Sequence, residues 1–133
     1  MRPLVQILSA VLAMALVVAC DAGGGTGTAL GYASAPASLD PASPTLAAKD
    51  IAFTTANLSV PAGKPFILVF ENGEAVMHNV SIYAGSAGSN RVFEGVSFTG
   101  PATRWYPVPA LSAGDYVFKC DLHPTMTGTL HAS

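Results

Sequence analysis

Charged residues are scarce in this sequence. They make up 11% of its 133 residues, and six Lys and Arg against eight Asp and Glu leave a formal net charge of -2. No cluster of Lys or Arg occurs, so the electrostatic footprint of a nucleic-acid-binding surface is missing and we expect no nucleic-acid partner. Hydrophobic residues make up 50% of the chain, which favours one packed domain over a disordered chain.

Cysteine is scarce too, since the chain has only two. Neither belongs to a CxxC or CxxCH motif, which argues against a thioredoxin-like dithiol, a covalently attached haem and a binuclear centre with two bridging thiolates. The signatures GxSxG and HExxH and a phosphate-binding loop are also missing, which argues against the enzyme classes that use them. Cys20 and Cys120 therefore need separate explanations.

The N-terminal residues have the pattern of an export signal. Arg2 precedes an apolar run from Leu4 to Ala19, which is shorter than the ~20 residues that a membrane-spanning helix needs. The run ends in VVAC, which resembles a bacterial lipobox, in which the cysteine is lipidated. We predict a lipoprotein signal peptide over 1–19 and an exported protein, lipid-anchored at Cys20 to a bacterial membrane and facing the periplasm or the cell exterior. The alternative is a soluble exported protein cleaved next to Cys20.

The next segment is dominated by small residues. After Cys20 the sequence reads DAGGGTGTALGYASAPASLDPASP, with few apolar side chains. Such a composition is typical of a flexible tether. We predict that 20–46 comprises the lipidated cysteine and a flexible linker, and that 47–133 is the folded domain.

The folded part reads as all β. Short runs rich in Val, Ile, Phe, Thr and Tyr alternate with turn signals such as PAGK, NGE, AGSAGSN, TGP and SAGD. No window shows a convincing helical period. About seven short strands in this length predict a two-sheet sandwich or a small Greek-key barrel.

The strand period of two predicts where two polar side chains point. His78 shares its face with Val80 and Ile82, and Cys120 shares its face with Tyr116 and Phe118, so both should point into the core. A buried imidazole needs hydrogen-bond partners or a metal. For either residue alone, an ordinary core histidine or an inert buried cysteine is the simpler interpretation.

The neighbours of Cys120 change that interpretation. His123 follows at the third position and Met126 three positions further on, so with His78 the set is one thiolate, two imidazoles and one thioether. A His₂Cys set with a weak axial Met is the arrangement of blue-copper sites. Zinc suits it less well, because Met serves neither a structural nor a catalytic zinc site.

Two segments resemble the cupredoxins, or type 1 blue copper proteins, in particular the plastocyanin and amicyanin-like branch. They are VPAGKPFILVFENGEAVMHNVSIY and PALSAGDYVFKCDLHPTMTGTL. The resemblance implies a two-sheet Greek-key β-sandwich of about seven to eight strands that binds one copper ion. It implies His78, Cys120 and His123 as ligands and Met126 as the axial ligand, with two residues between His123 and Met126, as in amicyanin.

The resemblance also suggests supporting residues around the ligands. Asn79 should tie the two ligand segments together by hydrogen bonding near Asp121, and Pro124 should stiffen the loop after His123. An apolar surface patch around the site would comprise Met77, Pro124 and Ala84. We interpret Glu71, Glu74 and Glu94 as solvated charges.

The function implied is electron transfer through one copper centre, with transient redox proteins as donor and acceptor. The alternative is a copper carrier or storage protein, although only Met77 and Met126 remain downstream of the signal. An enzyme with a second copper would need further histidines, and only His131 is left. We therefore expect no enzyme.

Overall fold

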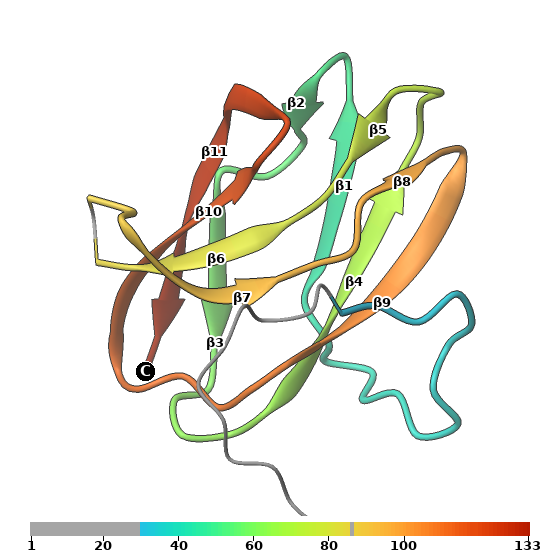
Figure 1. Ribbon diagram of the computed structural model, residues 1–133. Helices are drawn as coiled ribbons and strands as arrows, with labels where there is room; N and C mark the ends of the chain where they lie inside the picture. The colour runs from blue at the N-terminus through green and yellow to red at the C-terminus, as the bar shows by residue number, and fades with distance from the viewer. Residues whose placement is uncertain (1–29, 86) are drawn as a thin grey trace, which may run out of the picture.

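Alternating inward and outward side chains build two β-sheets that pack face to face (Figure 1). The computed structural model describes residues 30–85 and 87–133, and no helix appears among them. The strands are β1 (Thr45–Lys49), β2 (Ala52–Phe53), β3 (Asn57–Val60), β4 (Phe66–Asn72), β5 (Met77–His78), β6 (Ser81–Ala84), β7 (Asn90–Glu94), β8 (Phe98–Thr99), β9 (Ala102–Val108), β10 (Gly114–Cys120) and β11 (His123–Ala132). Eight of the strands described have four or more residues, which confirms the predicted sandwich of about seven to eight strands.

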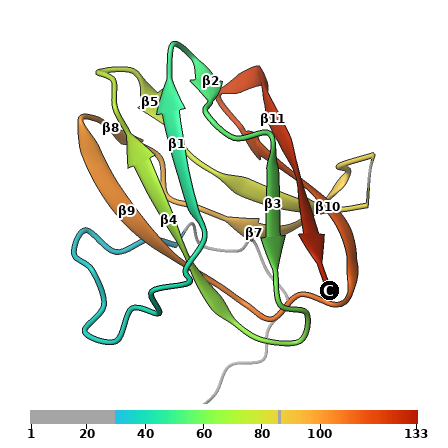
Figure 2. The ribbon, with the colours of Figure 1, turned by 180° about the vertical axis from the view of Figure 1, so that it is seen from behind.

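The two sheets have different strand orders. One sheet runs β2-β1-β4-β9, the other runs β3-β11-β10-β6-β7, and β5 pairs with β8 in a short ribbon. Pairing is antiparallel except for β1 with β4 and β3 with β11, which are parallel. Seen from behind, β1, β4 and β9 of the first sheet lie to the left of β3, β10 and β11 of the second (Figure 2).

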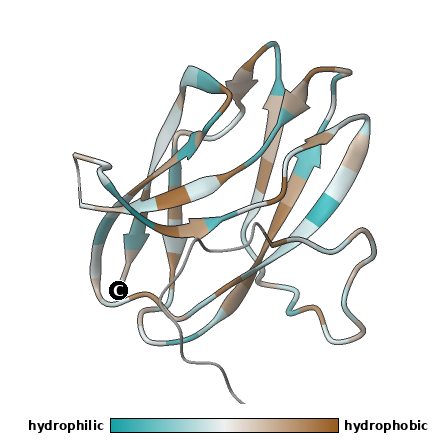
Figure 3. Cartoon of the chain, in the orientation of Figure 1, coloured by the Kyte–Doolittle hydropathy of each residue, from teal (hydrophilic) through white to brown (hydrophobic). Residues whose placement is uncertain are grey.

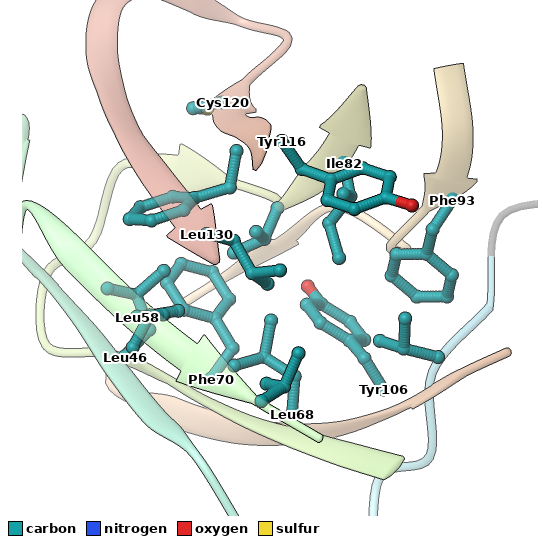
Figure 4. Packing of buried hydrophobic residues seen from close by; sticks show 14 of the residues in the cluster. Leu46, Leu58, Leu68, Phe70, Ile82, Phe93, Tyr106, Tyr116, Cys120 and Leu130 are labelled. Atoms are coloured by element: carbon teal, nitrogen blue, oxygen red, sulfur yellow. The ribbon is translucent and has the colours of Figure 1, made fainter. Parts of the chain in front are cut away.

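The core fills the space between the sheets. Hydrophobic residues recur along the strands of both sheets (Figure 3), and the close view shows their side chains meeting (Figure 4). Phe70 of β4 and Phe118 of β10 are fully buried, and Phe53 contacts both rings edge-on. Tyr106 is buried with its hydroxyl donating to the Val96 carbonyl at 2.8 Å, so its polar atom is satisfied.

Part of the segment predicted as a flexible linker, 20–46, contacts the folded domain. Strand β1 begins at Thr45 and buries Leu46. Further upstream, the amide of Leu30 donates to the Glu94 carbonyl at 2.8 Å, and Tyr32 exchanges two backbone hydrogen bonds with Trp105. A Cβ on Gly31 would lie within 2.9 Å of the Tyr106 ring, so the glycine allows this close approach.

The predicted signal peptide over 1–19 and the predicted lipidation site Cys20 lie outside the described residues. Within the described part of the chain, no helix is long and apolar enough to span a membrane.

Candidate metal centre

Three of the predicted metal ligands meet at one end of the sandwich, where β5 and the turn between β10 and β11 approach each other (top of Figure 1). His78 ends β5, Cys120 ends β10 and His123 begins β11. The Sγ of Cys120 lies 3.8 Å from Nδ1 of His78 and 3.4 Å from Nδ1 of His123. The two imidazole centroids are 4.7 Å apart.

These spacings suit a single metal ion. Bonds of about 2.0–2.3 Å from an ion to His nitrogen and Cys sulfur, at the wide angles of a trigonal site, separate the ligand atoms by about 3.5–4 Å. The ligand atoms of His78, Cys120 and His123 all lie within 4.8 Å of one another. His78 and Cys120 are buried and His123 is half-buried, so the group is shielded from water except on the His123 side.

Met126 enters the site region through an irregularity in the β10–β11 pairing. Cys120 pairs with His123, but Lys119 pairs with Thr127, so β11 has three additional residues in a bulge between these pairs. Met126 is one of the three and is only 1% exposed. The sequence predicted His123 and Pro124 in a loop, whereas both belong to β11; Pro124 lies exposed on the surface beside His123.

Asn79 and Asp121 are joined as expected. The side-chain amide of Asn79 donates to Asp121 Oδ2 at 2.9 Å, and the Asp121 backbone amide donates to Asn79 Oδ1 at 2.9 Å. The hydroxyls of Ser81 and Tyr83 donate to the same carboxylate. Burial raises the pKa of Asp121, but these donors outweigh burial and leave it below the ordinary value. Because Asn79 follows His78 and Asp121 follows Cys120, the pair joins the two segments that carry these predicted ligands.

The chain matches a known protein family over most of its length. A family model described as "Cupredoxin-like domain" matches residues 11–132. The chain belongs to the cupredoxin-like family. No curated protein matched the sequence of this cupredoxin.

Solved structures with the same fold include several bacterial cupredoxins. Amicyanin from Paracoccus versutus is 23% identical with a TM-score of 0.55, over 71% of this chain and 85% of its own. Auracyanin A from Chloroflexus aurantiacus, described as a "blue" copper protein, is 23% identical with a TM-score of 0.60, over 68% and 98%. Auracyanin from Roseiflexus castenholzii is 21% identical with a TM-score of 0.57, over 68% and 96%. At these identities the likeness shows a shared fold.

The donors of this cupredoxin fit one type 1 copper ion. One thiol and two imidazole nitrogens face a common point, and the thioether residue Met126 is buried in the same hairpin. This combination of soft and intermediate donors is the one that such copper sites use. The cofactor is therefore one copper ion.

Two polar residues that the sequence pattern did not connect with the site, Asn72 and Glu74, organise the loop before His78. Asn72 is 1% exposed, and its amide donates to the carbonyls of Val76 at 2.8 Å and Phe98 at 3.0 Å. Its Oδ1 accepts from the Glu74 amide at 3.0 Å. A side-chain oxygen of Asn that accepts from the backbone amide two residues later forms an Asx-turn, so the NGE motif indicated more than a generic turn.

Glu74 is the second missed residue, because the structure does not leave it as a solvated charge. Its Oε1 lies 2.9 Å from Nε2 of His78 and accepts from the Ile51 amide at 3.0 Å, and its side chain is 21% exposed. The Ile51 amide lowers the pKa of Glu74 most, partial burial opposes this, and His78 lowers it further. No spacing rule pointed from the sequence to this contact.

Exposed apolar side chains gather near the centre. Six large hydrophobic side chains are exposed among the described residues, and four of them belong to turns and strand ends near the site: Ile51, Val76, Met77 and Leu122. Met77 was predicted to belong to this patch. Ala84 was also predicted, but it pairs with Tyr116, four residues along β10 from Cys120, and so lies away from it.

Proposed function

We propose that this protein is an exported electron carrier, in which His78, Cys120 and His123 would hold one copper ion and Met126 would be its weakest ligand. One observation carries the proposal: both Nδ1 atoms face the sulfur of Cys120 at 3.4 and 3.8 Å within a largely buried group. A bound copper would supply the one-electron couple.

The chain's own residues suit fast exchange of an electron. Cys120 ends strand β10 of the sandwich, His78 ends β5 of the short β5–β8 ribbon, and the Asn79–Asp121 pair links the residues that follow them. Ligands held in this way move little when the charge of the ion changes, which keeps the reorganisation energy small. The protein acts in this proposal as a carrier and not as an enzyme.

The two imidazoles are buried to different extents, which indicates the side from which a redox partner reaches the centre. His78 is fully buried, whereas His123 is half-buried beside exposed Leu122 and Pro124. A small apolar surface of this kind suits brief encounters with redox proteins. We propose that donor and acceptor proteins dock over His123.

The test is a visible absorption and EPR spectrum of the purified protein loaded with one equivalent of Cu(II). An intense visible band from thiolate-to-Cu(II) charge transfer, with narrow copper hyperfine splitting, is expected. Cys120→Ser should abolish the band, while His131→Ala, which removes an exposed histidine paired with Asp115, should keep it. A pale protein that prefers Cu(I) would instead support the copper carrier or storage function.

Attachment to a membrane belongs to the same proposal and rests on the sequence ending VVAC at Cys20. When the full chain is expressed in a bacterium, Cys20→Ala should move it from the membrane fraction into the soluble fraction. Unchanged partitioning would contradict the anchor without affecting the copper centre.

A further inference from the structure

The imidazole of His78 is held from the side opposite the metal centre. Its Nδ1 faces the sulfur of Cys120, and its Nε2 lies 2.9 Å from Oε1 of Glu74. An ionised carboxylate only accepts hydrogen bonds, so Nε2 carries the ring hydrogen in the neutral imidazole and Nδ1 keeps its lone pair. The contact therefore selects the tautomer that binds metal through Nδ1.

Glu74 is itself fixed by bonds from three parts of the chain. The Ile51 amide donates to its Oε1 at 3.0 Å, its own amide donates to Asn72, and its carbonyl accepts from the Gly100 amide at 3.0 Å. Ile51 has a φ of 54°, which is rare for a β-branched residue. The turn at Ile51 thus directs the Ile51 amide at the Glu74 carboxylate, while Asn72 and Gly100 hold the Glu74 backbone.

We propose that Glu74 is a positioning residue for the copper centre. It fixes His78 with Nδ1 directed at the metal, and its negative charge favours Cu(II) over Cu(I), which lowers the reduction potential. The physical reason for the second effect is that a nearby anion stabilises the doubly charged ion more than the singly charged one. This inference rests on the proposed function.

Two variants separate orientation from charge. Glu74→Gln keeps an oxygen that accepts from His78 and removes the charge, whereas Glu74→Ala removes both. Glu71→Gln removes one charge from an exposed residue of the neighbouring strand β4 and serves as the matched control.

The first readout is the tautomer of His78 in the metal-free protein, measured by long-range ¹H–¹⁵N NMR at mildly alkaline pH. Wild type, Glu74→Gln and Glu71→Gln should show the hydrogen on Nε2 alone. Glu74→Ala should show a mixture of tautomers. A single Nε2–H tautomer in Glu74→Ala would overturn the orientation role.

The second readout is the reduction potential of the copper-loaded protein. A loss of a supporting contact of this kind weakens metal binding by about 10–100-fold, and a tenfold loss in the ratio of Cu(II) to Cu(I) affinity corresponds to about 59 mV. The potential should rise in Glu74→Gln, rise most in Glu74→Ala and stay unchanged in Glu71→Gln. Equal potentials in all four proteins would overturn the inference alone, whereas a colourless wild type would overturn the proposed function.

Discussion

Replacing Asn72 tests most directly what stabilises the loop between β4 and β5, which leads to His78. The change Asn72→Ala deletes two donated hydrogen bonds, to the carbonyls of Val76 and Phe98, and one accepted bond from the Glu74 amide. Each such bond contributes about 0.5–1.5 kcal/mol net, and a buried group left without a partner costs about 1–3 kcal/mol. The side chain is 1% exposed, so water replaces these partners poorly.

We expect the free energy of unfolding to fall by about 2–4 kcal/mol, less than the sum of the separate bonds, because the loop relaxes in part. Urea unfolding of the metal-free protein measures the change as a lower midpoint with an unchanged slope. Asn57→Ala, at the exposed first position of β3, should stay within about 0.5 kcal/mol of wild type.

A second substitution at the same position sharpens the test. Asn72→Asp keeps the oxygen that accepts from the Glu74 amide. It replaces the Asn72 amide group, which donates to the carbonyls of Val76 and Phe98 in the wild type, by a second oxygen that cannot donate. It should therefore destabilise at least as much as Asn72→Ala. A loss below about 1 kcal/mol in either variant would refute the view that this side chain organises the loop.

Two further variants test the axial ligand and the core. Met126→Leu should keep the visible band and raise the reduction potential, because an apolar side chain in place of the thioether disfavours the more highly charged ion. Voltammetry measures the shift in potential. Loss of copper binding would contradict a weak axial role for Met126. Burial raises the pKa of Tyr106, so above pH ~10, the ordinary tyrosine pKa, the unfolded state ionises first and the free energy of unfolding should fall as pH rises. Tyr106→Phe should show a smaller fall in urea titrations over this range, and an equal fall would assign the effect to other groups.

The sequence was sufficient for the fold and for the direction of the inward ligands. His78 and Cys120 are 0% and 1% exposed, as the period of two predicted. The same parity placed Asn79 and Ser81 on the opposite face, and both are nevertheless buried. Strand period gives the face of a side chain, but the Asp121 carboxylate and the Gly95 carbonyl that cover this face come from distant segments.

Other features depended on contacts that composition does not encode. The stretch around Gly31 has the residues of a tether, yet its backbone pairs with Trp105 because the missing side chain allows a close approach to Tyr106. The bulge that contains the buried Met126 could not be predicted from the sequence either, because a CxxH spacing fixes neither the strand register nor the number of unpaired residues.

The polar bonds around the centre divide into two kinds with different consequences for electron transfer. The Asn79–Asp121 bonds join neutral amides and a carboxylate between segments that follow two of the ligands, so they restrict how far His78 and Cys120 move relative to each other. The Glu74 carboxylate contacts the ring of His78 itself, so it acts on the electron density of a ligand as well as on its position. Cutting the first kind should slow electron self-exchange at nearly constant potential, because the reorganisation energy rises. Cutting the second kind should move the potential, and measuring both quantities on Asn79→Ala and Glu74→Gln therefore separates rigidity from charge.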